Sequence, residues 1–155
     1  WSDGKNIYGT DVPPPSIYHA WQNGKWVLTE KMLDGLKDEK LKQLNIAAQN
    51  YIDRATGVDK LPEFEIQTWA IQSTEAKTWQ ADKTAPTSVL DGIAAARGIP
   101  ADMLKAAALR KTLAYEQLAA HVAGQRQALQ SKIEAAKTQA ALDKIVITFT
   151  APEAV

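Results

Sequence analysis

The 155-residue sequence contains no cysteine, no long apolar run and no excess of charge of either sign. The lack of cysteine excludes disulfides, cysteine-ligated zinc, iron–sulfur clusters and thiol catalysis. No stretch of about 18 consecutive apolar residues occurs, so we expect no contact with a membrane through a spanning helix. Eighteen Lys and Arg balance eighteen Asp and Glu, which argues against nucleic acid as the main partner, because phosphate binding needs a net basic face.

Motifs for catalysis and metal binding are scarce as well. The two histidines, His19 and His121, fall in different predicted elements, and no His, Asp and Glu share metal-ligand spacing. No P-loop, G-x-G-x-x-G or G-x-S-x-G motif occurs. Acidic pairs such as Asp38-Glu39 lie beside lysines on predicted exposed helix turns, where a solvated face explains them. We predict no catalytic residue, no metal site and no cofactor, although a site assembled in space from distant residues stays open.

What is present fits a folded domain. Hydrophobic residues make up 45% and charged residues 23% of the chain, close to an average globular protein. The first six residues lack the basic start and apolar centre of a secretory signal. Because no methionine stands first, we expect a processed or truncated product.

Residues 1–28 form an aromatic, proline-rich segment that contains three of the five tryptophans. Pro13, Pro14 and Pro15 favour an extended connector. Two aromatic, β-favouring runs then flank Asn23-Gly24, which is the strongest short-range hairpin signal. We therefore predict a β-hairpin over residues 17–28.

After residue 28, apolar side chains recur at the spacing of amphipathic helices. The predicted helices run from a Thr29 cap to Gly57, from Pro62 to about residue 82, from residue 87 or 88 to 97, and from Pro100 to about residue 137, with a short turn near 139–143. Gly124 lies inside the longest helix, which is expected to bend or be closely approached there. Residues 144–149 are predicted to form a strand that could extend the hairpin.

The expected fold is therefore mainly α: a helical bundle with one long C-terminal helix and a small N-terminal β-hairpin, which a C-terminal strand could join. We divide the chain into the aromatic segment 1–28, a helical domain over 29–149 and a tail over 150–155. Trp69 and Trp79, on the second helix, are expected to lie in the core.

The N-terminal segment is the main candidate for binding, because its aromatic residues are too many for so small a core of their own. They are Trp1, Tyr8, Tyr18, Trp21 and Trp26. Such rings could form a small core, anchor a protein interface or stack on sugars. We take Tyr18, Trp21 and Trp26 as candidate partner-binding residues. The polar face of the long helix, with Gln117 and Arg126, is a second candidate surface.

Several runs together resemble tail fibre assembly proteins, and related tail-associated helical proteins, of tailed bacteriophages and prophages. They are Pro13-Pro14-Pro15 with His19-Ala-Trp21 and Gly24-Lys25-Trp26-Val27, then Gln67-Thr-Trp69-Ala-Ile-Gln72, Glu75-Ala-Lys77-x-Trp79, Leu90-Asp91-x-Ile93-Ala-Ala-Ala-Arg97-Gly98, and Gly124-x-Arg126-Gln127 with Ile133-x-Ala135-Ala136. The resemblance covers most of residues 13–145. It implies a chaperone without enzymatic activity that binds a trimeric tail fibre protein, acts in the host bacterial cytoplasm during assembly and needs no cofactor.

Three other functions stay open at this point. The chain could be a permanent component of a phage tail or baseplate, and so belong to the virion. It could be a carbohydrate-binding module that uses Trp21 and Trp26. It could also be an enzyme with a spatially assembled site, for which a deep polar pocket at His121 would be the sign.

Overall fold

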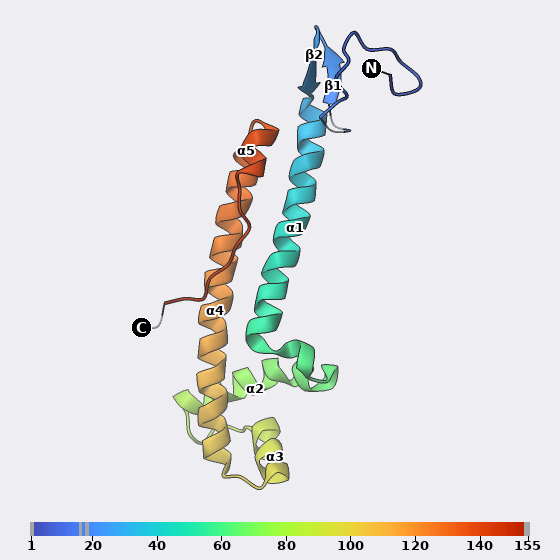
Figure 1. Cartoon of the computed structure of the whole chain (residues 1–155). Coiled ribbons are helices and arrows are strands. Elements are labelled where there is room, and N and C mark those ends of the chain that lie inside the picture. Colours follow the sequence, from blue (N-terminus) through green and yellow to red (C-terminus); the bar gives the residue numbers. More distant parts are fainter. Residues whose placement is uncertain (1, 16, 18, 154–155) are drawn as a thin grey trace. The chain divides into compact units, whose positions relative to one another are not determined.

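The architecture was obtained as a computed structural model, which describes residues 2–15, 17 and 19–153. Its elements are β1 (His19–Gln22), β2 (Lys25–Leu28), α1 (Glu30–Thr56), a 3₁₀ turn (Val58–Lys60), α2 (Glu63–Ala81), α3 (Ser88–Arg97), α4 (Ala101–Ala135) and α5 (Gln139–Asp143), as Figure 1 shows. The structure is 66% helical, with one small antiparallel hairpin. The prediction of a mainly α fold with a small N-terminal hairpin is confirmed.

Local signals set the ends of the helices. At the start of α1, the amide of Met32 donates to the Thr29 hydroxyl at 3.3 Å. Gly57 follows the last residue of α1 and adopts a left-handed φ of 69°, which a side chain would disfavour. At α5 the Thr138 hydroxyl accepts from the amide of Ala141 at 3.1 Å. These are short-range interactions, which is why the sequence predicted the helix bounds closely.

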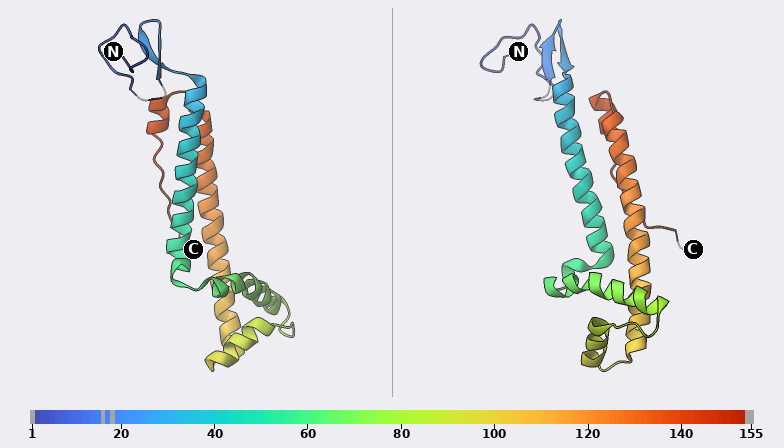
Figure 2. Two further views of the ribbon diagram at one scale, coloured as in Figure 1. Left: turned by 90° about the vertical axis from the view of Figure 1, so that its right-hand side faces the viewer. Right: turned by 180° about the vertical axis from the view of Figure 1, so that it is seen from behind.

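The chain divides into two compact units, each of which takes part of α1 and part of α4. The first unit comprises residues 1–48 and 125–148. Figures 1 and 2 show the early turns of α1 beside the last turns of α4 within it. Leu44, Ile133 and Leu142 are buried there. At its edge, Lys37 Nζ donates to the backbone oxygen of Glu134 at 2.7 Å and Arg126 donates to Asn45 Oδ1 at 3.1 Å.

The second unit comprises residues 49–124 and 149–155 and has its own core between α2, α3 and the start of α4. Ala76, Leu90, Ala94 and Leu104 are buried in that core. Trp79 is buried, as predicted, whereas Trp69 is only half-buried. The two differ because α3 packs against the C-terminal half of α2, where Trp79 lies.

A carboxylate from α2 caps α3. The two oxygens of Glu75 accept hydrogen bonds from the amides of Val89 and Leu90, at 3.0 and 2.9 Å. The local cap residue, Thr87, makes no capping hydrogen bond with its side chain and donates instead to Asp91 Oδ2 at 3.0 Å. The start of α3 is thus held by α2, and the negative charge of the Glu75 carboxylate also suits the positive N-terminal end of the α3 dipole.

Lys105 is a buried cation in the same unit. Its Nζ lies 2.9 Å from Asp91 Oδ1 and 6.0 Å from the centre of a Trp79 ring. The hydrogen bond from Lys105, followed by that from Thr87, lowers the pKa of Asp91. The ammonium group therefore has a partner at the surface while its methylene stem packs inside.

The predicted strand at residues 144–149 is wrong. The segment is not part of any sheet among the described residues, and the hairpin has only its two strands. Burial nevertheless alternates along the segment, because Ile145, Ile147 and Phe149 are half-buried and the residues between them are exposed. Phe149 packs against Tyr51, with 6.0 Å between ring centres. Phe149 thus meets α1, and among the described residues no strand pairs with this segment.

Gly124 was expected to mark a bend or a close approach. A side chain added at Gly124 would meet nothing within 4 Å, so among the described residues no element approaches it closely. The helix α4 is continuous through this position.

Candidate functional site

The hairpin presents the aromatic residues that the sequence singled out. Asn23 and Gly24 occupy the turn with positive φ values of 49° and 81°, the conformation that a two-residue hairpin turn needs. The resulting register places Trp21 directly opposite Trp26. Their ring centres lie 5.1 Å apart at an interplanar angle of 68°, an edge-to-face contact. The predicted hairpin is confirmed, and its turn explains why the two tryptophans meet.

Trp26 is fixed from several sides. Its indole N–H donates to the backbone oxygen of Val12 at 2.9 Å, which ties the proline-rich connector to the hairpin. The ring of Tyr8 lies 5.0 Å from that of Trp26, at an interplanar angle of 51°. Trp21 and Trp26 are both half-buried, but the ring contact with Trp26 is the single ring contact described for Trp21. Trp26 therefore organises the cluster, and Trp21 is better placed to meet a partner.

An anionic turn supports Tyr8. Asp3 accepts hydrogen bonds from the amides of Asn6 and Lys5 at 2.8 and 2.9 Å, and the Tyr8 hydroxyl donates to its second oxygen at 2.9 Å. These three hydrogen bonds, in that order, lower the pKa of Asp3 to about 2. The same contact raises the pKa of Tyr8. At neutral pH the carboxylate is therefore charged, and it holds the Tyr8 ring beside Trp26.

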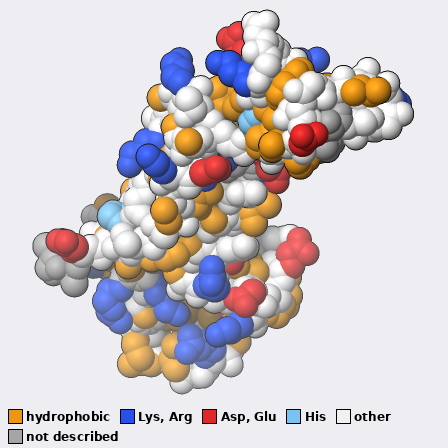
Figure 3. Space-filling view, turned by 45° about the horizontal axis from the view of Figure 1, so that its top comes forward, with side chains coloured by type: hydrophobic (Ala, Val, Ile, Leu, Met, Phe, Trp, Pro, Cys, Tyr) orange, Lys and Arg blue, Asp and Glu red, His pale blue; other side chains and the backbone are white. Residues whose placement is uncertain are grey.

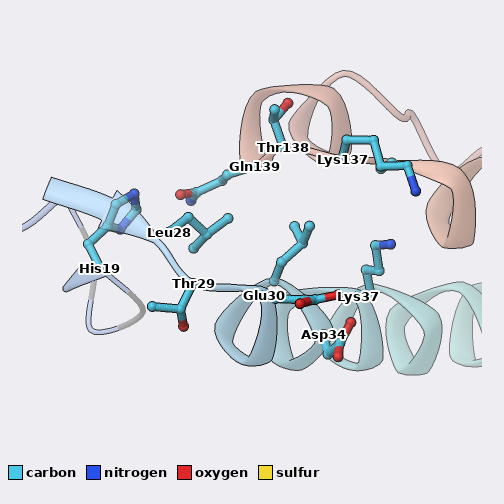
Figure 4. Close-up of a pocket in the computed structure, with 11 residues that line it drawn as sticks. His19, Leu28, Thr29, Glu30, Asp34, Lys37, Lys137, Thr138 and Gln139 are labelled. Atoms are coloured by element: carbon cyan, nitrogen blue, oxygen red, sulfur yellow. The ribbon is translucent and has the colours of Figure 1, made fainter. Parts of the chain in front are cut away.

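A cavity of about 490 Å³ lies next to the hairpin within the first unit. Figure 4 shows Thr138 and Gln139 of the α5 region on one side and Glu30, Asp34 and Lys37 of α1 on the other, with His19 of β1 at one end. Two carboxylates and two lysines, Lys37 and Lys137, contribute to this lining. Such mixed charge suits a polar segment of another chain better than an apolar small molecule.

The described residues include no group of three or more His, Asp and Glu that could hold a metal ion. His121 was the residue on which an enzymatic alternative depended. Its Nε2 atom is buried, and no hydrogen-bond partner for it is described. Neither the cavity beside the hairpin nor a second hollow, lined by Asp34, Lys37, Asp38, Leu41 and Glu134, includes His121.

The predicted partner-binding residues fall in different places. Trp21 and Trp26 lie together on the hairpin. Arg126 belongs to the same unit but pairs with Asn45 in the middle of α1, and it does not line the cavity. Gln117 is exposed on the part of α4 that belongs to the second unit. Tyr18 lies outside the described residues.

Sequence reasoning missed the cavity residues of α1 and α5. Glu30 and Asp34 carry no motif, since two carboxylates four residues apart are common on exposed helices. The sequence predicted a short helical turn near residues 139–143, but only the fold brings α5 to α1. On the face of the molecule drawn in Figure 3, hydrophobic side chains are interspersed with charged side chains of both signs.

One family model is similar to part of the chain. Residues 110–147 match the family model of the HI1402 helical domain, which covers less than half of the chain. They comprise most of α4, all of α5 and the residues that follow it. No curated protein and no solved structure matches. In the described part of the chain, none of the helices combines the length and apolarity that crossing a membrane requires.

Proposed function

We propose that this protein is a non-enzymatic tail fibre assembly protein of a bacteriophage or prophage, which binds a fibre protein through the hairpin and the cavity beside it. The family resemblance of the sequence suggests the partner. The paired tryptophans of the hairpin supply a surface by which a protein partner could be bound. On this proposal the chain acts in the host bacterial cytoplasm during assembly.

The observation that carries the proposal is the geometry of the tryptophan pair. Trp26 is held by Val12, Tyr8 and Trp21, so little side-chain freedom is left to lose when a partner binds. Trp21 lies beside it, is half-buried and has fewer described contacts. Pre-ordered tryptophans with exposed area are typical anchors of protein interfaces.

The cavity adds a polar contribution. The cavity adjoins the hairpin that carries the two tryptophans, since His19 of β1 and Leu28 of β2 line it. Its carboxylates and lysines therefore lie close to that hairpin. A partner that covers the hairpin would therefore meet both an aromatic anchor and charges of both signs. Charges at a rim of this kind mainly set orientation and partner choice.

Co-expression with the tail fibre gene tests the proposal. We expect soluble fibre yield to depend on this chain, and Trp21→Ala to weaken fibre binding by about 2 kcal/mol or more, roughly 30-fold. Tyr115→Ala is the matched control, because Tyr115 is 48% exposed on α4 in the second unit. Full fibre rescue by Trp21→Ala would remove the hairpin from the binding surface, and Gln117 and Arg126 would become the better candidates.

The alternatives make different predictions. A permanent tail or baseplate component would be found in purified virions, whereas a chaperone that dissociates would be absent from them. A carbohydrate-binding module would bind glycans without any fibre protein. The edge-to-face angle between Trp21 and Trp26 favours the protein interface, because two rings at 68° do not form one flat platform for a sugar.

A further inference from the structure

The turn of the hairpin contains a chemically reactive pair of residues. Asn23 and Gly24 connect β1 to β2, and both residues are exposed. Figures 1 and 2 show this turn at the end of the hairpin that lies away from α1. A Cβ atom added at Gly24 would meet nothing within 4 Å, so among the described residues no other element covers that side of the turn.

The side-chain amide of an asparagine can react with the backbone nitrogen of the residue that follows it. At this turn the Gly24 nitrogen would attack Cγ of Asn23. A new C–N bond forms, the bond from Cγ to the side-chain nitrogen breaks, and that nitrogen leaves as ammonia with the proton of the Gly24 amide. Water then opens the cyclic imide at either of its two carbonyl groups, which gives aspartate or isoaspartate. The reaction needs no reactant other than water.

The structure favours this reaction at Asn23. Glycine has no side chain to hinder closure of the ring. Neither the Gly24 amide nor the Asn23 side chain has a hydrogen-bond partner in the part of the chain that the structure describes. In a two-residue hairpin the backbone hydrogen bonds join the flanking residues instead, here Gln22 and Lys25. The attacking nitrogen can therefore lose its proton to solvent without first breaking a hydrogen bond.

The chain has three other asparagines, and each is followed by a bulky residue. They are Asn6, Asn45 and Asn50, which precede Ile7, Ile46 and Tyr51. Asn45 and Asn50 lie within α1, where the amide of the next residue donates to a helix carbonyl. Asn6 is exposed and non-helical like Asn23, so the main difference is the branched side chain of Ile7. These residues provide internal controls for hydrogen bonding and for steric hindrance.

We propose that Asn23 is a site of spontaneous deamidation, and that isoaspartate at this position uncouples Trp21 from Trp26. Isoaspartate continues the main chain through its side-chain carbonyl, which adds a methylene group to the backbone of the turn. The two-residue turn sets the register that places Trp21 opposite Trp26, and a lengthened turn no longer fixes it. Ordinary aspartate keeps the turn, because Asp-Gly also adopts the positive φ values that it needs.

The consequence for a partner rests on the proposed function. If the fibre protein binds the ordered tryptophan pair, the isoaspartate form loses the pre-ordering of that surface. The ability of the chain to bind the fibre protein would then decline with the age of the chain, without a protease or a modifying enzyme. Each deamidation product also adds a negative charge to a chain whose formal net charge is zero, so the aged forms can be separated by ion exchange.

Peptide mass mapping of the full chain, aged at mildly alkaline pH, tests the deamidation. We expect conversion of amide to acid at Asn23 to be at least about tenfold faster than at Asn6, Asn45 and Asn50, with isoaspartate among the products. Asn23→Gly is the matched control, because Gly-Gly keeps the turn and has no side-chain amide. Conversion at Asn23 that is no faster than at Asn6 overturns the proposal.

NMR of the aged chain tests the uncoupling of the tryptophans. We expect nuclear Overhauser contacts between the rings of Trp21 and Trp26 to be lost in the isoaspartate fraction. They should be retained in Asn23→Asp and in an equally aged Asn23→Gly chain. Ring contacts that persist in the isoaspartate fraction overturn the uncoupling. An isoaspartate fraction that lacks these contacts and still binds the fibre protein as tightly as the fresh chain supports the uncoupling and refutes the hairpin as the fibre-binding surface.

Discussion

Removing the carboxylate of Glu75 should destabilise the second unit more than removing the local cap of α3. Glu75 accepts from two backbone amides, those of Val89 and Leu90, at 3.0 and 2.9 Å. Hydrogen bonds to a charged group contribute about 1.5–3 kcal/mol each, and the helix dipole adds about 0.3–1 kcal/mol. Because the site is only part-buried, water recovers some of this, and we expect Glu75→Ala to lower the free energy of unfolding by about 3 kcal/mol.

Two further variants separate the capping from packing. Glu75→Gln keeps the size of the side chain and one acceptor oxygen, so it should lose about 1–2 kcal/mol. Thr87→Val keeps the buried volume of Thr87 and loses only its hydrogen bond to Asp91, so it should lose about 1 kcal/mol. Urea denaturation followed by tryptophan fluorescence would measure all three. If Thr87→Val proves more damaging than Glu75→Ala, the cap from α2 does not hold α3 as we argue.

Two charged residues and a glycine give three more predictions. Lys105→Met should change the free energy of unfolding by less than about 1 kcal/mol, whereas Lys105→Ala should lower it by about 2–3 kcal/mol. The packed stem of Lys105 matters more than its ion pair with Asp91, because the Asp91 side chain is 50% exposed. Equal melting temperatures of the two variants would contradict this. The NMR signal of the Asp3 carboxyl carbon should titrate with a midpoint near pH 2. Because the pKa of Asp3 is lowered, the turn is fully stabilised above the ordinary aspartate pKa of about 3.9 and loses this stabilisation as the pH falls through about 2. A midpoint near the ordinary value of about 4 would show that Tyr8 and the amides do not hold the carboxylate. Gly124→Ala should raise the melting temperature and increase the free energy of unfolding by about 1 kcal/mol, since alanine favours a helix and the added side chain has open space. A lower melting temperature would mean that another chain approaches there.

Features that depend on neighbouring residues could be predicted from the sequence. Asn23-Gly24 defined the hairpin turn, and Thr29 and Gly57 defined the ends of α1, because each acts over a few residues. The pairing of Trp21 with Trp26 follows from that turn alone.

Features that depend on distant residues could not be predicted. A search for caps beside α3 finds Thr87, whereas the cap comes from Glu75 on another helix. The cavity needs Glu30 of α1 and Gln139 of α5, which no pattern in the sequence connects. The strand predicted at residues 144–149 is absent from the described structure, because the residue types of one segment do not show whether another strand pairs with it.

Hydrogen exchange would not detect the order of residues 144–149. Ile145, Ile147 and Phe149 are half-buried, yet within the described part of the chain the backbone amides of residues 146–149 have no hydrogen-bond partner. Their amide hydrogens should exchange with deuterated solvent nearly as fast as those of an unfolded peptide, while the side chains report a fixed environment. A truncation designed from exchange data alone would therefore remove residues that contribute to packing.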